Sequence, residues 1–123
     1  MRRVALQHVS IETRPGDVEA CVRFYELVGF RRVEPPPSLA DRATWFERDG
    51  TQVHLMLADE PVVPPEGHHA VVVDAYEDTL AALRAAGFDP EPRSEHWGAP
   101  RAFVRNPAGH RVELMAAPPP RHG

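Results

Sequence analysis

Lysine is absent from this chain of 123 residues, so all 14 basic side chains are arginines, and 18 aspartates and glutamates outnumber them. The formal net charge is −4 at pH 7. A surface that binds nucleic acid or anionic lipid needs a dense array of positive charge. We therefore expect neither nucleic acid nor a membrane among the partners of this protein.

Cysteine is also scarce, and long apolar runs are missing. Cys21 is the only cysteine, so no disulfide can form within the chain, which favours a reducing compartment, and we expect the cytoplasm. No apolar stretch approaches the roughly 20 residues of a transmembrane helix. The N-terminal segment reaches His8 and Glu12 before any long apolar run, so we expect no signal peptide.

Proline, by contrast, is abundant, with 14 residues that fall in clusters. Such clusters are typical of stiff connections between elements rather than of general disorder. The length suits one compact domain. We therefore predict a single domain over residues 1–123, with a proline-rich tail at 117–123.

The chain contains an internal repeat. His8 and His54 are 46 positions apart, and His68 and Glu113 are 45 apart (54 − 8 and 113 − 68). Each pair encloses a helical segment that ends in Gly-Phe, at residue 29 and again at residue 87. Two segments with matching internal spacing indicate a duplicated unit. We predict two modules, at about 3–58 and 67–116.

The sequence pattern of each module predicts one strand, then one helix, then three strands. In the first helix Val18, Cys21, Val22, Tyr25 and Val28 form an apolar stripe with helical spacing. Tyr76, Leu80 and Leu83 do the same in the second helix. Runs with strand character cover about 4–13, 30–34, 43–48 and 51–57, then 67–73, 88–91, 101–105 and 110–116. The predicted fold class is α+β, built from two βαβββ modules.

Strand alternation directs four polar side chains away from the apolar face. His8, His54 and Glu113 each alternate with apolar neighbours, and the repeat selects His68 rather than His69 as the equivalent of His8. Imidazole and carboxylate groups are ligands for Zn²⁺, Fe²⁺, Mn²⁺, Co²⁺ or Ni²⁺. We therefore predict a divalent metal site of His8, His54, His68 and Glu113; the alternative is chance convergence of structural residues without a metal.

Three segments resemble the vicinal-oxygen-chelate superfamily, which holds glyoxalase I, bleomycin-resistance proteins, fosfomycin-resistance enzymes and extradiol dioxygenases. They are His8-Val9-Ser10-Ile11, the segment from Val22 to Phe30, and the segment from Asn106 to Leu114. The similarity runs from about residue 3 to 116 and is greatest to small bacterial glyoxalase-like proteins.

The resemblance implies a curved mixed sheet around a metal-centred cleft, with ligands from the first and fourth strand of each module, and a homodimer. Those strands carry the four predicted ligands. Glyoxalase I has glutamate where this chain has His54. The ligand set of the dioxygenases corresponds to His8, His68 and Glu113, which leaves coordination positions open for substrate and O₂.

These observations predict a metal-dependent enzyme that acts on a small molecule with two adjacent oxygens, through bidentate chelation and Lewis-acid catalysis. The reaction is a glyoxalase-like lyase or isomerase step or a dioxygenation, with Glu113 or His54 as the catalytic base. The alternative is a protein that binds a drug or toxin without turning it over, as bleomycin-resistance proteins do.

The walls of the substrate pocket are predicted on the third strand of each module. The candidates are Trp45, Phe46, Phe103, Arg101 and Arg105. For the three aromatic residues, packing in the core is the alternative. The identity of the substrate and of the metal, and the number of chains that build each site, are left open by the sequence.

Overall fold

The computed structural model describes residues 5–122 and divides the chain into two compact units, one ending at Val63 and the other beginning at Pro64. The first unit contains β1 (His8–Thr13), α1 (Val18–Leu27), β2 (Arg31–Val33), β3 (Ala43–Arg48) and β4 (Thr51–Leu57). Short 3₁₀ turns at Pro15–Asp17 and Pro37–Leu39 begin at prolines, whose fixed φ suits a first helical position.

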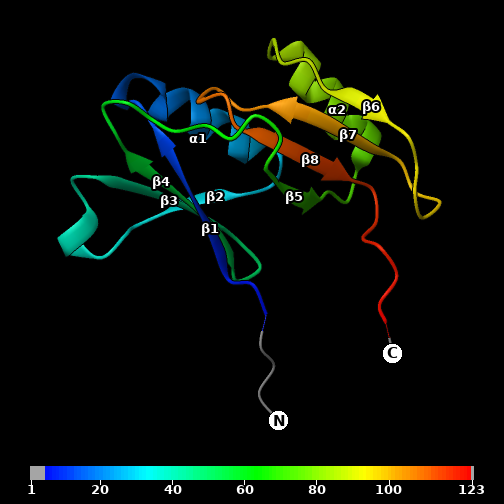
Figure 1. The fold of residues 1–123 in the computed structure, drawn as a ribbon, viewed down its shortest axis with the longest axis horizontal. Coiled ribbons are helices and arrows are strands. Elements are labelled where there is room, and N and C mark those ends of the chain that lie inside the picture. The colour runs from blue at the N-terminus through cyan, green and yellow to red at the C-terminus, as the bar shows by residue number, and fades with distance from the viewer. Residues whose placement is uncertain (1–4, 123) are drawn as a thin grey trace. The chain divides into compact units, whose positions relative to one another are not determined.

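The second unit repeats this order with β5 (His68–Val72), α2 (Tyr76–Ala85), β6 (Glu91–Arg93), β7 (Arg101–Arg105) and β8 (Arg111–Met115). Figure 1 shows the two units, with α2 lying against the strands of the second. Among the described residues no helix is long and apolar enough to cross a membrane.

Each unit forms one four-stranded mixed sheet, and the two sheets have the same topology. The strand orders are β1-β4-β3-β2 and β5-β8-β7-β6, with the first pair parallel and the others antiparallel. The registers also agree. His8 lies opposite Gln52 as His68 lies opposite Arg111, and residue 45 pairs with 54 as 103 pairs with 113. The predicted α+β fold with two βαβββ modules is confirmed.

One face of each sheet is covered by apolar side chains. In the first unit Ile11, Val53 and Leu55 are buried, and Phe46 stacks on Tyr25 of α1 with ring centroids 5.0 Å apart. Along each strand, the residues that alternate with these buried side chains point to the opposite face of the sheet, and His8 is one of them. The helix therefore covers the apolar face and leaves the polar face of the sheet for the candidate site.

Two local details differ from the sequence prediction. The buried face of α1 is formed by Cys21, Phe24, Tyr25 and Val28, whereas Val18 and Val22 are only half-buried. The strand expected at 88–91 is instead β6, at Glu91–Arg93. Pro92 cannot donate a backbone hydrogen bond, and it is tolerated because β6 lies at the edge of its sheet.

Tight turns hold the ladders in register. Asp49 and Gly50 both have positive φ, 51° and 83°, as a type I′ hairpin turn requires. Gly29 and Gly87, at φ 99° and 94°, end the two helices in the left-handed conformation. In the second unit the Asn106 side chain accepts hydrogen bonds from the backbone of Ala108 and His110, both at 3.0 Å. These turns determine where β4 and β8 begin, and thus which residues reach the site.

Candidate metal centre

In the first unit two candidate ligands are stacked against one another. The rings of His8 and His54 lie 4.1 Å apart and 19° from parallel. On its other side His54 is covered by Trp45, with a centroid distance of 3.9 Å and an angle of 2°. His54 is buried, with 7% of its surface exposed, whereas His8 is exposed. This stack fixes the plane of the His54 ring.

The hydrogen bonds of both rings identify which nitrogen carries the proton. Gln7 donates its amide N–H to the Gly50 carbonyl, so its Oε1 faces His8 Nδ1, at 2.7 Å. Gln52 donates to a Glu47 carboxylate oxygen, so its Oε1 faces His54 Nε2, also at 2.7 Å. An amide oxygen only accepts, so both histidine nitrogens are donors. His8 Nε2 and His54 Nδ1 therefore retain their lone pairs.

The electrostatic environment keeps His54 neutral. Burial lowers the pKa of His54 below its ordinary value of 6.5, and the adjacent charge of His8 lowers it further. Desolvation penalises the imidazolium form, and a second positive charge repels it. At neutral pH the free Nδ1 is therefore available to bind a cation or accept a proton.

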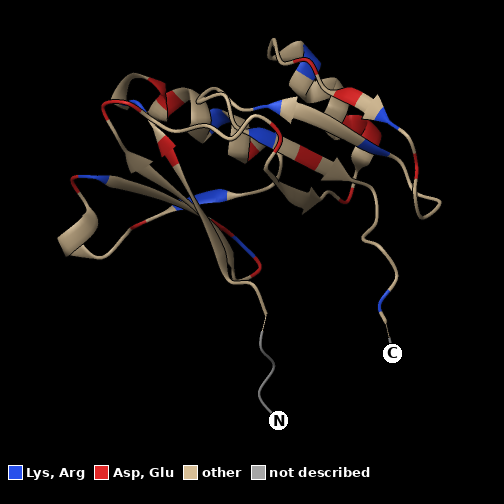
Figure 2. Ribbon diagram, viewed as in Figure 1, with Lys and Arg blue, Asp and Glu red and all other residues tan. Residues whose placement is uncertain are grey.

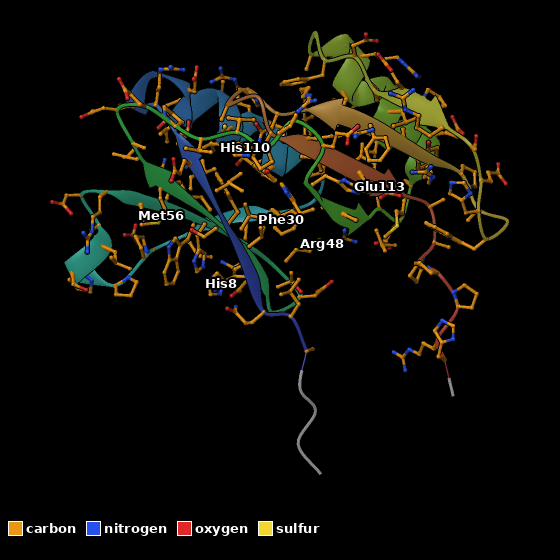
Figure 3. All side chains as sticks on the ribbon, in the orientation of Figure 1. His8, Phe30, Arg48, Met56, His110 and Glu113 are labelled. Atoms are coloured by element: carbon orange, nitrogen blue, oxygen red, sulfur yellow. The ribbon has the colours of Figure 1, made fainter. Side chains whose placement is uncertain are left out.

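In the second unit His68 approaches Glu113, which lies on β8 as Figure 3 shows. His68 Nε2 is 3.2 Å from Glu113 Oε1, and His68 Nδ1 is 3.0 Å from the Glu66 carbonyl oxygen. Because a carbonyl only accepts, Nδ1 carries a proton. The lone pair of Nε2 would then face a carboxylate oxygen. A cation bound between the two groups would make that approach favourable.

Arg101 orients the second oxygen of this carboxylate. Its Nη1 is 3.4 Å from Glu113 Oε2, and its Nε donates to the Ser94 carbonyl at 2.7 Å. Glu113 is 7% exposed, so a buried carboxylate here needs such a partner. Arg101 therefore orients the candidate ligand Glu113, and its predicted contact with the substrate stays a prediction.

The remaining predicted pocket residues lie in different environments. Trp45 and Phe103 lie on the sheet faces that carry the candidate ligands, because Trp45 stacks on His54 and Phe103 makes an edge contact with His68, at 4.9 Å. Arg105 donates to two loop carbonyls, those of Pro65 and Gly109, at 3.0 and 3.1 Å. It therefore stabilises the loops beside β7.

The expected place of Phe46 in the pocket wall does not agree with the structure. Its side chain is fully buried on the opposite face of β3 and stacks on Tyr25. Neighbouring residues of a strand point to opposite faces, and Trp45 occupies the face that holds His54. Phe46 is therefore a core residue.

The structure thus brings the four predicted ligands together as two pairs, His8 with His54 and His68 with Glu113. In the described part of the chain, no three histidine, cysteine, aspartate or glutamate side chains gather into a cluster that could hold a metal. Each unit therefore carries one pair of the four predicted ligands.

Sequence reasoning missed the residues that orient these ligands. They are Gln7, Gln52 and the Glu66 carbonyl for the three imidazoles. Gln52 lies two residues before His54 on the same strand, so alternation could have placed it on the same face. A backbone carbonyl such as that of Glu66 leaves no signal in the sequence.

Comparison with known proteins identifies the family of the chain. Residues 5–114 match the family model described as the Glyoxalase/Bleomycin resistance protein/Dioxygenase superfamily. The chain belongs to this superfamily. No curated protein matches the chain. Members of the superfamily generally use a divalent metal ion.

Solved structures of the superfamily have the same fold. A glyoxalase family protein from Bacillus anthracis has 23% identity and a TM-score of 0.80, covering 94% of this chain and 98% of its own. Fosfomycin resistance protein FosX from Mesorhizobium loti has 19% identity, coverage of 95% of both chains and a TM-score of 0.73. Lactoylglutathione lyase from Agrobacterium tumefaciens has 18% identity, coverage of 94% and 95%, and a TM-score of 0.69.

Proposed function

We propose that the protein is a metal-dependent enzyme that acts on a small molecule with two adjacent oxygens. One observation carries this proposal: each of the three candidate histidines has one ring nitrogen bonded to an oxygen acceptor and the other directed away from that acceptor. Histidines that bind metals almost always donate their second N–H in this way, because the bond sets the tautomer and orients the ring.

The donor atoms of the two pairs are of the kinds that divalent transition metals bind. They are His8 Nε2, His54 Nδ1, His68 Nε2 and an oxygen of Glu113. Three neutral imidazoles and one carboxylate would leave a bound M²⁺ with a net charge of +1, and such an ion supplies Lewis acidity to substrate oxygens. The charge balance favours an anionic or enolisable ligand.

The residues of the chain also provide acid–base groups. His54 is neutral at neutral pH and has a free Nδ1, so it can accept a substrate proton when it is not itself a ligand. The alternative base is Glu113, whose carboxylate is held between His68 and Arg101. Trp45 and Phe103 provide apolar walls beside the two pairs. This set suits isomerase, lyase or dioxygenase chemistry.

The test is the metal content of purified protein, measured by mass spectrometry without chelators. We expect about one transition metal per four-ligand site in the wild type and at least tenfold less after His68→Ala or Glu113→Gln. His96→Ala and Glu95→Gln are matched controls, since both residues are exposed on the loop after β6. Unchanged metal content in the first two variants would contradict the proposal and favour a binding protein without catalysis.

We further propose a homodimer, as the family resemblance implies, in a reducing compartment such as the cytoplasm, which suits a chain with one cysteine. Sedimentation should then give twice the chain mass of 13.7 kDa, and a monomer would contradict the dimer.

Mixing two variants decides how many chains build one site. One variant lacks His8 and His54, and the other lacks His68 and Glu113. If the ligands come from two chains, the mixed dimer regains one intact site and binds metal. If each site lies within one chain, the mixture binds none.

A further inference from the structure

Arg111 lies on β8 of the second unit, and its guanidinium forms no ion pair with any described residue. The Arg111 guanidinium lies over the Phe103 ring, with its central carbon 3.7 Å from the ring centroid. Among the described residues, no carboxylate or carbonyl hydrogen-bonds to it. The neighbouring arginines differ, because Arg93 pairs with Glu91 at 3.1 Å and Arg101 bonds to a carboxylate and a carbonyl. The hydrogen-bond donors of Arg111 are therefore available.

Arg111 lies beside the candidate metal ligands. It is two residues before Glu113 on β8, so both side chains are on the same face of the sheet, and its register partner on β5 is His68. On β8 the basic residue comes first and the acidic one two positions later, and Figure 2 colours the basic and acidic segments of this sheet. The free guanidinium is therefore a near neighbour of both His68 and Glu113.

A hollow of about 350 Å³ adjoins this guanidinium. Its lining residues are Pro65, Glu66, Asp89, Glu91, Arg93, Phe103, Val104, Arg105 and Arg111. The carboxylate of Glu91 is already paired with Arg93, and those of Glu66 and Asp89 form no ion pair with Arg111. The volume is at the small end of ligand pockets, which span roughly 300–1,000 Å³. It suits a small molecule.

We propose that Arg111 determines specificity by binding an oxyanion, a carboxylate or phosphate group, of a small substrate. A guanidinium presents planar N–H donors that match two oxygens at once, and such charge-assisted pairs are stronger than neutral hydrogen bonds. The Phe103 ring supports the guanidinium through a cation–π contact, so little side-chain entropy remains to be lost when an anion binds.

Anion binding at Arg111 is independent of the metal, whereas its role in substrate selection rests on the proposed function. The experiment therefore uses the full chain with a chelator present. Inorganic phosphate and benzoate are titrated at constant ionic strength, and binding is followed by two-dimensional NMR. We expect shifts at Arg111 and the start of β8, and binding weakened by about 10- to 100-fold in Arg111→Gln.

Two further variants distinguish anion binding at Arg111 from attraction of anions to any surface arginine. Arg23→Gln removes the same charge from an exposed position on α1 and should leave binding unchanged. Arg111→Lys keeps the charge and removes the planar donor pair, so it should bind less tightly than the wild type while remaining folded. Equal affinity in the wild type, Arg111→Gln and Arg23→Gln would overturn the proposal.

The outcome also distinguishes this inference from the proposed function. Protein that binds these anions through Arg111 but never holds a metal would contradict the enzyme proposal alone. Protein that holds a metal but binds both anions equally well without Arg111 would contradict the Arg111 proposal alone.

Discussion

His69 should make the stability of the protein depend on pH in a measurable way. It lies on β5, half-buried, on the strand face opposite His68. Burial lowers the pKa of His69 from 6.5 to about 4, with smaller contributions from the charges of His110 and His68. The nearby His110, labelled in Figure 3, is itself 5% exposed. The folded state therefore resists protonation of this ring.

The size of the effect follows from proton linkage. Because the pKa of His69 is lower in the folded state, the unfolded state binds more protons between pH 6.5 and 4, so acid favours unfolding. The full contribution to stability is present above pH 6.5. About 2 kcal/mol of the unfolding free energy should be lost by pH 5 and about 3 kcal/mol by pH 4, at 1.36 kcal/mol per pKa unit.

Urea denaturation followed by circular dichroism, with a chelator present, measures this loss at several pH values. The decisive quantity is the difference between the wild type and His69→Gln, because titrations common to both proteins cancel. His96→Gln, on an exposed loop, should behave as the wild type does. If the wild type and His69→Gln lose the same unfolding free energy between pH 7 and pH 5, or if NMR places the pKa of His69 near 6.5, the reasoning is wrong.

Three other predictions concern the core and the candidate metal centre. Phe24→Ala removes a fully buried ring and should lower the unfolding free energy by about 3–5 kcal/mol; a loss below about 1 kcal/mol in urea denaturation would contradict the packing of α1. With Trp97 replaced by Phe, Co²⁺ should quench the fluorescence of Trp45, which stacks on His54, and His54→Ala should abolish the quenching. Arg101→Gln should weaken metal affinity by about 10- to 100-fold in competition with a chelator, since it frees the ligand carboxylate; unchanged affinity would assign Arg101 another role.

Much of the fold follows from local rules that operate along the chain. Strand alternation, the repeated spacing of histidines and the Asp49-Gly50 turn are properties of neighbouring residues, so the βαβββ order was predictable. The placement of His8 and His54 on one face follows from the same alternation. Alternation also implies that Trp45 and Phe46 cannot both face the site, although it does not indicate which of the two does.

Only the tertiary structure decided the remaining features, because they depend on contacts between segments far apart in the chain. The rotation of α1 that buries Phe24 instead of Val22 is set by the sheet beneath it. The register of β3 against β4 places Trp45 rather than Phe46 beside His54. The ring nitrogen of each histidine that keeps its lone pair is set by nearby amide and carbonyl oxygens. The unpaired guanidinium of Arg111 is recognised only once the partners of the other arginines are known. A donor's availability depends on three-dimensional neighbours, which residue spacing does not encode.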